Sequence, residues 1–141
     1  GRLDEAADEY IAPRLAAIRP GFDESFSAPN PLAILASLHL RAEPWAGEAF
    51  EALRRNCPLS VACTLVAVRK AREFKRLEDA LAIEYRFAWR CSEEGDFLEG
   101  IRAAVVDKDR KPNWSPARLE EVTAERVAAM LAPLGENELG L

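Results

Sequence analysis

The sequence predicts an all-α fold, an irregular bundle of about seven short helices joined by short loops. Two observations carry this prediction. Alanine and leucine dominate the chain while β-branched residues rarely cluster, which favours helix over strand. Apolar residues also recur every three or four positions in successive segments, and capping residues or prolines precede several of these segments. No internal repeat is present.

The first expected helix carries an apolar stripe within residues 3–11, with acidic residues opposite. Pro13 removes a backbone hydrogen bond and predicts a break just before it. A second short helix follows and ends before Arg19-Pro20-Gly21. We therefore expect residues 1–21 to form an amino-terminal helical stump and residues 22–141 to form a single helical domain.

Further helices are expected in the middle of the chain. Asn30 and Pro31 form an N-cap and first-turn pair, which predicts a helix to about Leu40. A tryptophan-bearing amphipathic helix follows and ends near Asn56. From Pro58 the chain is apolar almost all round the helix, a pattern that is typical of a central, buried helix.

Composition and charge exclude several classes of function. The chain has 141 residues, of which 49% are hydrophobic and 30% charged, as in a globular domain. A net charge of -5 argues against nucleic acid as a partner. No apolar run approaches the roughly 18 residues of a membrane span, so no membrane partner is expected.

Three cysteines without a C-x-x-C pair indicate free thiols in a reducing compartment, which predicts a cytoplasmic protein without a metal site. His39 is the only histidine. It could act as a general base, but no nucleophile with a carboxylate partner is arranged around it. We therefore expect a structural role for His39, at the surface or half-buried.

The stretch 84–116 carries the most information about function. Asp96 and Glu99 stand at the N-cap and N3 positions of a capping box, in which each carboxylate accepts a backbone N–H of the first helical turn. A helix is therefore expected to begin at Phe97. Gly100 lies inside it, and glycine there costs roughly 1 kcal/mol relative to alanine. Its presence indicates close approach by another backbone or by a ligand.

Residues of this stretch follow one another in a dense pattern: Glu84-Tyr85-Arg86, Asp96-Phe97, Glu99-Gly100-Ile101-Arg102-Ala103, Asp107-Lys108-Asp109, Pro112, Trp114 and Pro116. The pattern resembles the closing signature of 3-hydroxyisobutyryl-CoA hydrolases, a branch of the crotonase superfamily of enoyl-CoA hydratases and isomerases. A weaker match upstream includes Phe26-Ser27 and the segment 56–60, with Cys57 where serine is usual. The resemblance covers about residues 22–123.

The resemblance implies that the chain is the carboxy-terminal helical lobe of a larger, crotonase-type enzyme. In that family the catalytic core precedes this region, and its backbone N–H groups hold the thioester oxyanion while its glutamates do the acid–base work. We therefore predict no catalytic residue in this chain. The implied partners are the missing crotonase core and the acyl-CoA substrate, and no cofactor is expected to be bound permanently.

Lys108 is the one cofactor-binding residue that the resemblance implies. In crotonases the lysine of a shorter version of this ending lies near the adenosine phosphate end of coenzyme A. It often reaches the cofactor from a neighbouring subunit, which adds a homo-oligomer to the implied partners.

Two charged features and one apolar face leave alternatives open. Residues 69–76 hold five cations and one anion, which either dock phosphates or an acidic face of the core or, as we favour, form a solvated helix end. Glu84 falls in the middle of an apolar helix side, so we expect it to be buried beside a basic partner or several donors, in a structural role. Trp114 and the first helix are expected to line an exposed apolar face.

The function predicted from the resemblance is that of a lobe of an acyl-CoA thioester hydrolase of valine degradation, inactive by itself. An enoyl-CoA hydratase or isomerase of the same superfamily is one alternative. A separate, non-catalytic helical interaction subunit is the other.

Overall fold

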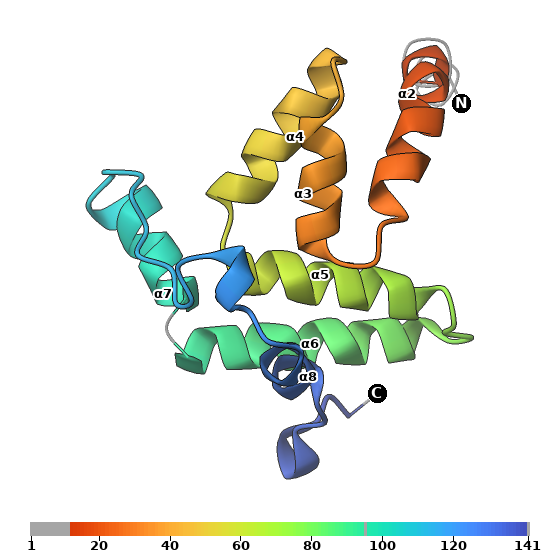
Figure 1. Ribbon diagram of the computed structural model, residues 1–141. Coiled ribbons are helices and arrows are strands. Elements are labelled where there is room, and N and C mark those ends of the chain that lie inside the picture. The colour runs from red at the N-terminus through yellow and green to blue at the C-terminus, as the bar shows by residue number, and fades with distance from the viewer. Residues whose placement is uncertain (1–11, 95, 141) are drawn as a thin grey trace, which may run out of the picture. The chain divides into compact units, whose positions relative to one another are not determined.

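The computed structural model describes residues 12–94 and 96–140, and within these ranges it is helical without a strand (Figure 1). The all-α prediction is confirmed. The α-helices are α2 (Ala12–Phe26), α3 (Pro31–His39), α4 (Pro44–Arg55), α5 (Pro58–Ala71), α6 (Leu77–Glu94), α7 (Asp96–Ile101) and α8 (Ala124–Leu131). A π-helical turn η1 (Arg102–Val106) and two 3-10 turns, η2 (Leu119–Glu121) and η3 (Gly135–Asn137), complete the elements.

The chain packs as two compact units, one ending at Leu53 and the other beginning at Arg54. The expected first helix, within residues 3–11, lies outside the described residues. The division into a stump and a lobe after residue 21 stays a prediction. No helix within the described ranges is both long and apolar enough to cross a membrane.

In the first unit, the predicted helix end before Pro20 is wrong, because α2 continues through this proline to Phe26. A proline inside a helix removes one hydrogen bond and crowds the preceding turn. The residues beyond it make tertiary contacts that favour the continued helix. The ring of Phe22 lies 6.2 Å from that of Trp45 between centroids, and Ser25 is completely buried.

Arg41 organises the first unit around that buried serine. Its Nε donates to Ser25 Oγ at 2.8 Å, and Ser37 Oγ lies 3.0 Å from the same oxygen. The guanidinium also pairs with Glu24 and Glu43 and lies 5.6 Å from the ring centre of Trp45. The serine therefore joins α2 to α3 and to the loop that follows α3.

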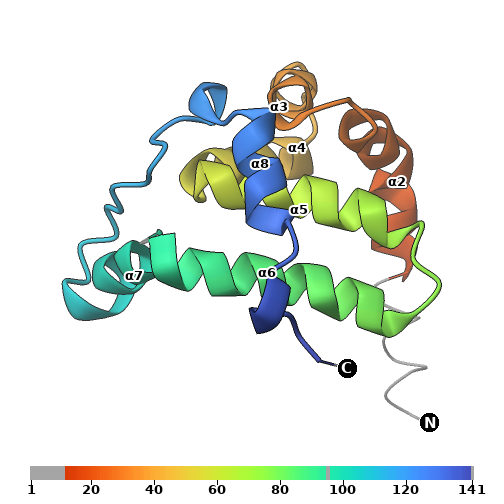
Figure 2. The same ribbon diagram turned by 90° about the horizontal axis from the view of Figure 1, so that it is seen from below.

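The core of the second unit lies between α5, α6 and α8. Helices α5 and α6 run antiparallel, and α8 packs across them (Figure 2). The buried core consists of Cys57, Leu59, Ala62, Cys63, Ile83, Val127, Met130 and Leu131. The prediction of a buried helix from Pro58 is confirmed for its first half, whereas Val68 near its end is exposed.

The buried side of α6 differs from the predicted one, and the burial expected for Glu84 is wrong. Glu84 is exposed, and its neighbour Ile83 enters the core with 5% exposure. The apolar side is centred on Ile83 and Phe87 rather than on Leu77 and Leu81, both of which are exposed. The buried side of α6 is thus rotated about the helix axis from the predicted one. The carboxylate of Glu84 stays in solvent and therefore needs no buried partner.

The end of the chain is held to α6 by two arginines. Arg90 Nη1 donates to the carbonyls of Met130 and Ala132 at 3.1 and 2.6 Å, so it satisfies carbonyl groups at the end of α8. Arg86 Nε pairs with Glu138 at 2.8 Å. These contacts fix the segment after α8 against α6.

Candidate functional site

The carboxylates of α7 bind the extended segment that follows η1. Asp96 Oδ1 accepts the backbone N–H of Ser115 at 3.1 Å, and Glu99 Oε1 accepts that of Asn113 at 2.6 Å. The capping box predicted backbone N–H partners for both carboxylates, but the N–H groups belong to residues 14 and 19 positions further along the chain. The acids thus hold a distant segment against the helix.

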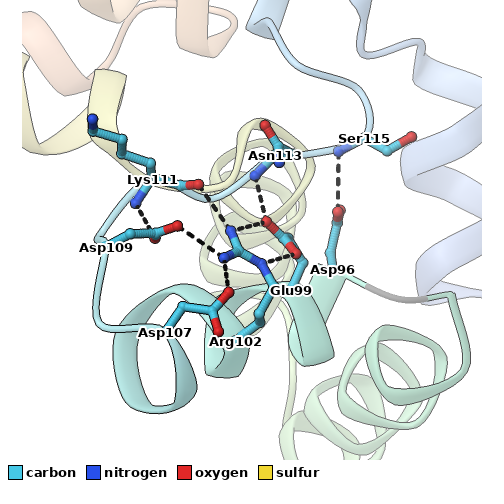
Figure 3. A network of polar contacts seen from close by, with 8 residues as sticks. All are labelled: Asp96, Glu99, Arg102, Asp107, Asp109, Lys111, Asn113 and Ser115. Carbon is cyan, nitrogen blue, oxygen red and sulfur yellow. Dashed lines mark hydrogen bonds and ion pairs between the residues drawn. The ribbon is translucent and has the colours of Figure 1, made fainter.

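Arg102 is the centre of this network (Figure 3). Its Nε and Nη2 each lie 2.8 Å from one oxygen of Glu99, a bidentate pair in which both oxygens are bound. Nη1 donates to Asp107 and, at 2.9 Å, to Asp109, while Nη2 also donates to the carbonyl of Lys111 at 3.0 Å. One guanidinium therefore connects α7 to both ends of the 107–111 turn.

The network changes the acidity of its carboxyl groups. Hydrogen bonds from Arg102 and from the Asn113 N–H lower the pKa of Glu99 to about 2. The pKa of Asp109 is also lowered, first by the N–H of Lys111, which donates at 2.8 Å, and then by Arg102. The carboxylates of Glu99 and Asp109 are therefore charged throughout the neutral range.

The turn that Arg102 encloses has an unusual backbone. In η1 the N–H of Asp107 donates to the carbonyl of Arg102 at 2.8 Å, which widens the helix by one residue. Lys108 and Arg110 then adopt positive φ angles of 57° and 55°. Each such residue other than glycine costs roughly 1 kcal/mol or more, so the surrounding contacts must hold the turn in place.

Trp114 packs against the glycine of α7. A Cβ atom added to Gly100 would lie 3.3 Å from Trp114 Cη2. A group does approach Gly100 closely, but it is an indole side chain rather than the backbone or ligand that the sequence predicts. Trp114 is half-buried, and its Nε1 donates to the carbonyl of Arg55 at 3.4 Å. The extended segment is thus fixed at Trp114 as well as at Glu99 and Asp96.

Trp114 also lines an open apolar groove of about 570 Å³. Its other walls come from the start of α5, from the second half of α6 and from α7 and η1; the residues are Cys57, Ser60, Phe87, Ala88, Cys91, Asp96, Phe97, Gly100, Ile101, Ala104 and Val105. Phe97 and Val105 are 56% and 62% exposed. Trp114 thus lines an exposed apolar face, as predicted, and this groove is that face. The first helix, which was expected to line the face as well, lies outside the described residues.

Cys57 connects the groove to the polar network. Its Sγ donates to Asp96 Oδ2 at 3.3 Å, and burial is the main cause that raises the pKa of the thiol. Asp96 therefore receives the thiol on one oxygen and the Ser115 N–H on the other. The thiol is a protonated donor in a structural contact.

The structure places the predicted cofactor residue, Lys108, in the turn that Arg102 holds. Its side chain is exposed and has no hydrogen bond or ion pair to any residue in the described ranges. Sequence reasoning did not anticipate the role of Arg102. The available signal was one arginine placed three residues after a glutamate and followed by the two aspartates of Asp107-Lys108-Asp109.

None of the other singled-out residues takes part in the described contacts of this network. His39 is exposed at the end of α3, with its ring 5.3 Å from that of Phe50. In the run 69–76, Lys70, Arg72, Lys75 and Arg76 are exposed. This exposure fits the favoured interpretation, a solvated helix end, and docking by this run stays an untested alternative.

With this geometry established, comparison with known sequences assigns the chain to a class. The sequence model of the enoyl-CoA hydratase/isomerase family matches residues 2–131, and the chain belongs to this family. Among curated relatives, the mitochondrial 3-hydroxyisobutyryl-CoA hydrolase of Gallus gallus is 39% identical over 116 residues, which are 82% of this chain and 30% of the relative. That of Rattus norvegicus is 36% identical over 114 residues, 81% of this chain and 29% of the relative. The predicted resemblance to these hydrolases is confirmed.

The chain spans about 30% of the length of these curated relatives. Among solved structures, an enoyl-CoA hydratase from Rhodobacter sphaeroides 2.4.1 superimposes with a TM-score of 0.85 at 42% identity, covering 91% of this chain and 38% of that one. A further relative, the small ribosomal subunit protein mS47 of Arabidopsis thaliana, is 38% identical over 96 residues, 65% of this chain and 23% of the relative. Proteins of different function therefore share this helical region.

The predicted cytoplasmic localisation is wrong by this comparison, because the hydrolase relatives carry mitochondrial names. The prediction rested on cysteines that form no disulfide pattern. Reduced thiols indicate only that a compartment keeps thiols reduced, and they do not distinguish one such compartment from another.

Proposed function

We propose that this chain is the carboxy-terminal helical lobe of an acyl-CoA thioester hydrolase that resembles 3-hydroxyisobutyryl-CoA hydrolase and acts in valine degradation. The catalytic groups belong to a crotonase core outside this chain. The lobe closes over the acyl and pantetheine channel, and by itself it does not turn over substrate. The observation that carries the proposal is the 39% identity to a named hydrolase over 116 residues that include the Arg102 network.

The exposed apolar surface of the second unit supports a role as a covering lobe. Phe97, Ile101 and Val105 recur along α7 and η1, are all exposed and line the groove beside Trp114. Burying an apolar side chain of this size contributes about 1.5–3 kcal/mol. A face with several such residues is stabilised when a partner surface covers it, and the proposed occupant is the crotonase core of the same enzyme.

Lys108 is proposed to contact the phosphates at the adenosine end of coenzyme A. Its side chain is exposed, as a phosphate-binding lysine must be, and the turn that carries it is fixed by the Arg102 network. An ammonium group contacts phosphate as a point charge, which requires position more than a particular orientation.

The proposal is tested with the polypeptide translated from the native gene and with residues 1–141 alone. Hydrolysis of 3-hydroxyisobutyryl-CoA adds water across the thioester and releases the acid and the free thiol of coenzyme A. We expect thiol release from the native-gene product and none from residues 1–141. Thiol release by residues 1–141 alone would contradict the inactivity of the lobe.

Two alternatives rest on particular relatives. The solved structure that is 42% identical is titled an enoyl-CoA hydratase, which favours hydration. Loss of crotonyl-CoA absorbance without thiol release would select this alternative. The ribosomal relative favours a non-catalytic interaction subunit. A native-gene product with a mass of 15.6 kDa that processes neither substrate would select that one.

A further inference from the structure

A furrow of about 200 Å³ runs between α5 and α6, which lie antiparallel and side by side (Figure 1, Figure 2). Each helix lines it with residues at positions i, i+3, i+4 and i+7, which share one side of a helix. These residues are Thr64, Ala67, Val68 and Ala71 of α5 and Ala80, Ile83, Glu84 and Phe87 of α6. The furrow therefore follows both helices for about two turns, or about 10 Å.

Part of the apolar surface at this furrow is open to solvent. Val68 is 56% exposed, and Ala71, one turn further along α5, is exposed as well. Leu77 and Leu81 lie on the same side of α6 as Ala80 and are 72% and 40% exposed. These side chains extend the buried apolar side of α6 into solvent. A face of this kind is stabilised when another surface covers it.

Glu84 limits which surface can cover the furrow. Among the described residues that line the furrow, it alone is charged. Its side chain is exposed and makes no hydrogen bond or ion pair with a residue in the described ranges. Arg86, by contrast, pairs with Glu138 at 2.8 Å. A covering surface would remove water from the Glu84 carboxylate, which is costly unless a cation replaces it. The occupant must therefore bring a positively charged group to Glu84.

The shape of the furrow indicates what kind of element fills it. A third helix packs over two neighbouring helices by placing its apolar side chains between their rows of residues. Three of the lining residues are alanines, which let the backbone of such a helix approach closely; they are Ala67, Ala71 and Ala80. A helix whose apolar side carries one arginine or lysine meets the requirements of both shape and charge.

We propose that the furrow between α5 and α6 docks a helix of the crotonase core, and that Glu84 forms an ion pair with a basic residue of this helix. The chain spans about 30% of the length of its curated relatives, so most of their length has no counterpart in it. The inference rests on the proposed function, because it requires that core. Its new content is a second docking surface, separate from the groove beside Trp114, and the role of Glu84.

Photo-cross-linking in the native-gene polypeptide identifies the occupant. Leu81 is replaced by p-benzoylphenylalanine, and the cross-linked peptide is identified by mass spectrometry after digestion with chymotrypsin. Mixing unlabelled and isotope-labelled polypeptide distinguishes contacts within one chain from contacts between copies. We expect a cross-link within one chain, to a segment outside residues 1–141 that contains an arginine or lysine. Leu40 is the matched control position, because it is 86% exposed and does not line the furrow. It should not yield this peptide.

Charge reversal then tests the ion pair. Glu84→Lys places two cations together and should lower the melting temperature of the native-gene polypeptide by about 5 °C. Reversal of the basic residue in the cross-linked peptide to glutamate should restore most of this loss. Glu93→Lys is the control, because Glu93 is exposed on α6 and lies about two and a half turns further on, on the opposite side of the helix. This control should stay within about 1 °C of the wild type.

The other outcomes separate this inference from the proposed function. A cross-link to residues 1–141, to a second copy or to nothing overturns the inference, and so does a loss in Glu84→Lys that the second reversal does not restore. If such a polypeptide still releases thiol from 3-hydroxyisobutyryl-CoA, the proposed function stands without this inference. A native-gene polypeptide with a mass of 15.6 kDa contains no core and overturns both.

Discussion

Each unit of the chain contains an arginine cluster with a tryptophan and a glycine nearby, and the two clusters differ in what they hold. In the first unit, Arg41 bonds to buried Ser25 and lies against Trp45, and its side chain is 16% exposed. In the second unit, Arg102 is 30% exposed and binds carboxylates and a carbonyl of one turn. The first cluster joins helices, whereas the second shapes a loop.

The two glycines make room for different groups. A Cβ on Gly21 would lie 2.9 Å from Arg41 Nη1 and 3.1 Å from Trp45, so this glycine admits both members of its cluster. A Cβ on Gly100 would meet only the indole of Trp114, at 3.3 Å. Similar residue types therefore serve global stability in one unit and local order in the other.

The largest effect is expected from Arg41→Met. It removes the hydrogen bond to buried Ser25 and the contact with Trp45, so we expect the first unit to lose about 2–3 kcal/mol of unfolding free energy. The ion pairs with Glu24 and Glu43 contribute little, because both carboxylates are exposed. Arg102→Met should instead raise hydrogen exchange only near residues 107–113. Exchange that rises throughout α5 and α6 in the second variant would contradict the comparison.

A smaller contrast is expected between two alanine substitutions. Gly21→Ala should destabilise the first unit by about 1–2 kcal/mol net, because Ser25 holds the guanidinium that the new methyl group would meet. Gly100→Ala should change stability by less than about 0.5 kcal/mol, since a gain of roughly 1 kcal/mol in helix propensity offsets a slight displacement of Trp114. Urea unfolding of both variants measures the difference. Equal losses would show that the glycines have the same role.

Acid should weaken the Arg102 cluster by protonating Glu99. The pKa of Glu99 falls from an ordinary value of 4.5 to about 2 in the folded chain, so the unfolded state binds more protons between these values. The stabilisation by this carboxylate is therefore complete above about pH 4.5 and is lost as the pH falls through about 2. The amide resonance of Asn113, which donates to Glu99, should titrate with this midpoint.

Glu99→Gln is the control for this titration, because it removes the ionisable group and keeps an oxygen for the Asn113 N–H. The transition near pH 2 should disappear in this variant. A midpoint near 4.5 in the wild type would mean that the pair with Arg102 does not persist in solution.

The smallest effect is expected from Cys57→Ser. The hydroxyl is a stronger donor to Asp96 than the thiol, but it is less favourable than sulfur in a residue only 8% exposed. These contributions oppose one another, so the net change should be below about 1 kcal/mol. Thermal unfolding measures it. A loss of several kcal/mol would assign Cys57 a larger part in the core than its contact with Asp96.

The comparison also shows which features the sequence could predict. Helix caps could be predicted from the sequence, because an N-cap side chain bonds within its own helical turn. Asn30 accepts the N–H of Ala33 at 2.9 Å, and Thr123 accepts that of Arg126 at 3.2 Å. The family signature could be recognised for another reason, since its residues lie close together in the sequence and in a fixed order. It pointed to the region of the site before any contact was known.

Contacts between residues that are far apart in the sequence could not be predicted in this way. The sequence predicts Asp96 and Glu99 as caps because it offers no measure of how near Ser115 and Asn113 lie. It predicts a buried Glu84 because a helix face drawn from small residues is wide, and a shift of one position exchanges Glu84 with Ile83. In each case tertiary packing decided between alternatives that looked equal locally.

The π-helical turn at Arg102–Val106 has a consequence for how relatives are aligned. Such a turn holds one residue more than an α-helical turn, so it accommodates a single-residue insertion while the helix before it stays intact. Homologous endings of different length can then share the helix and the tryptophan segment, with the added residue confined to this turn. Alignments across residues 102–106 should therefore permit a one-residue gap, and the position of that gap decides which lysine corresponds to Lys108.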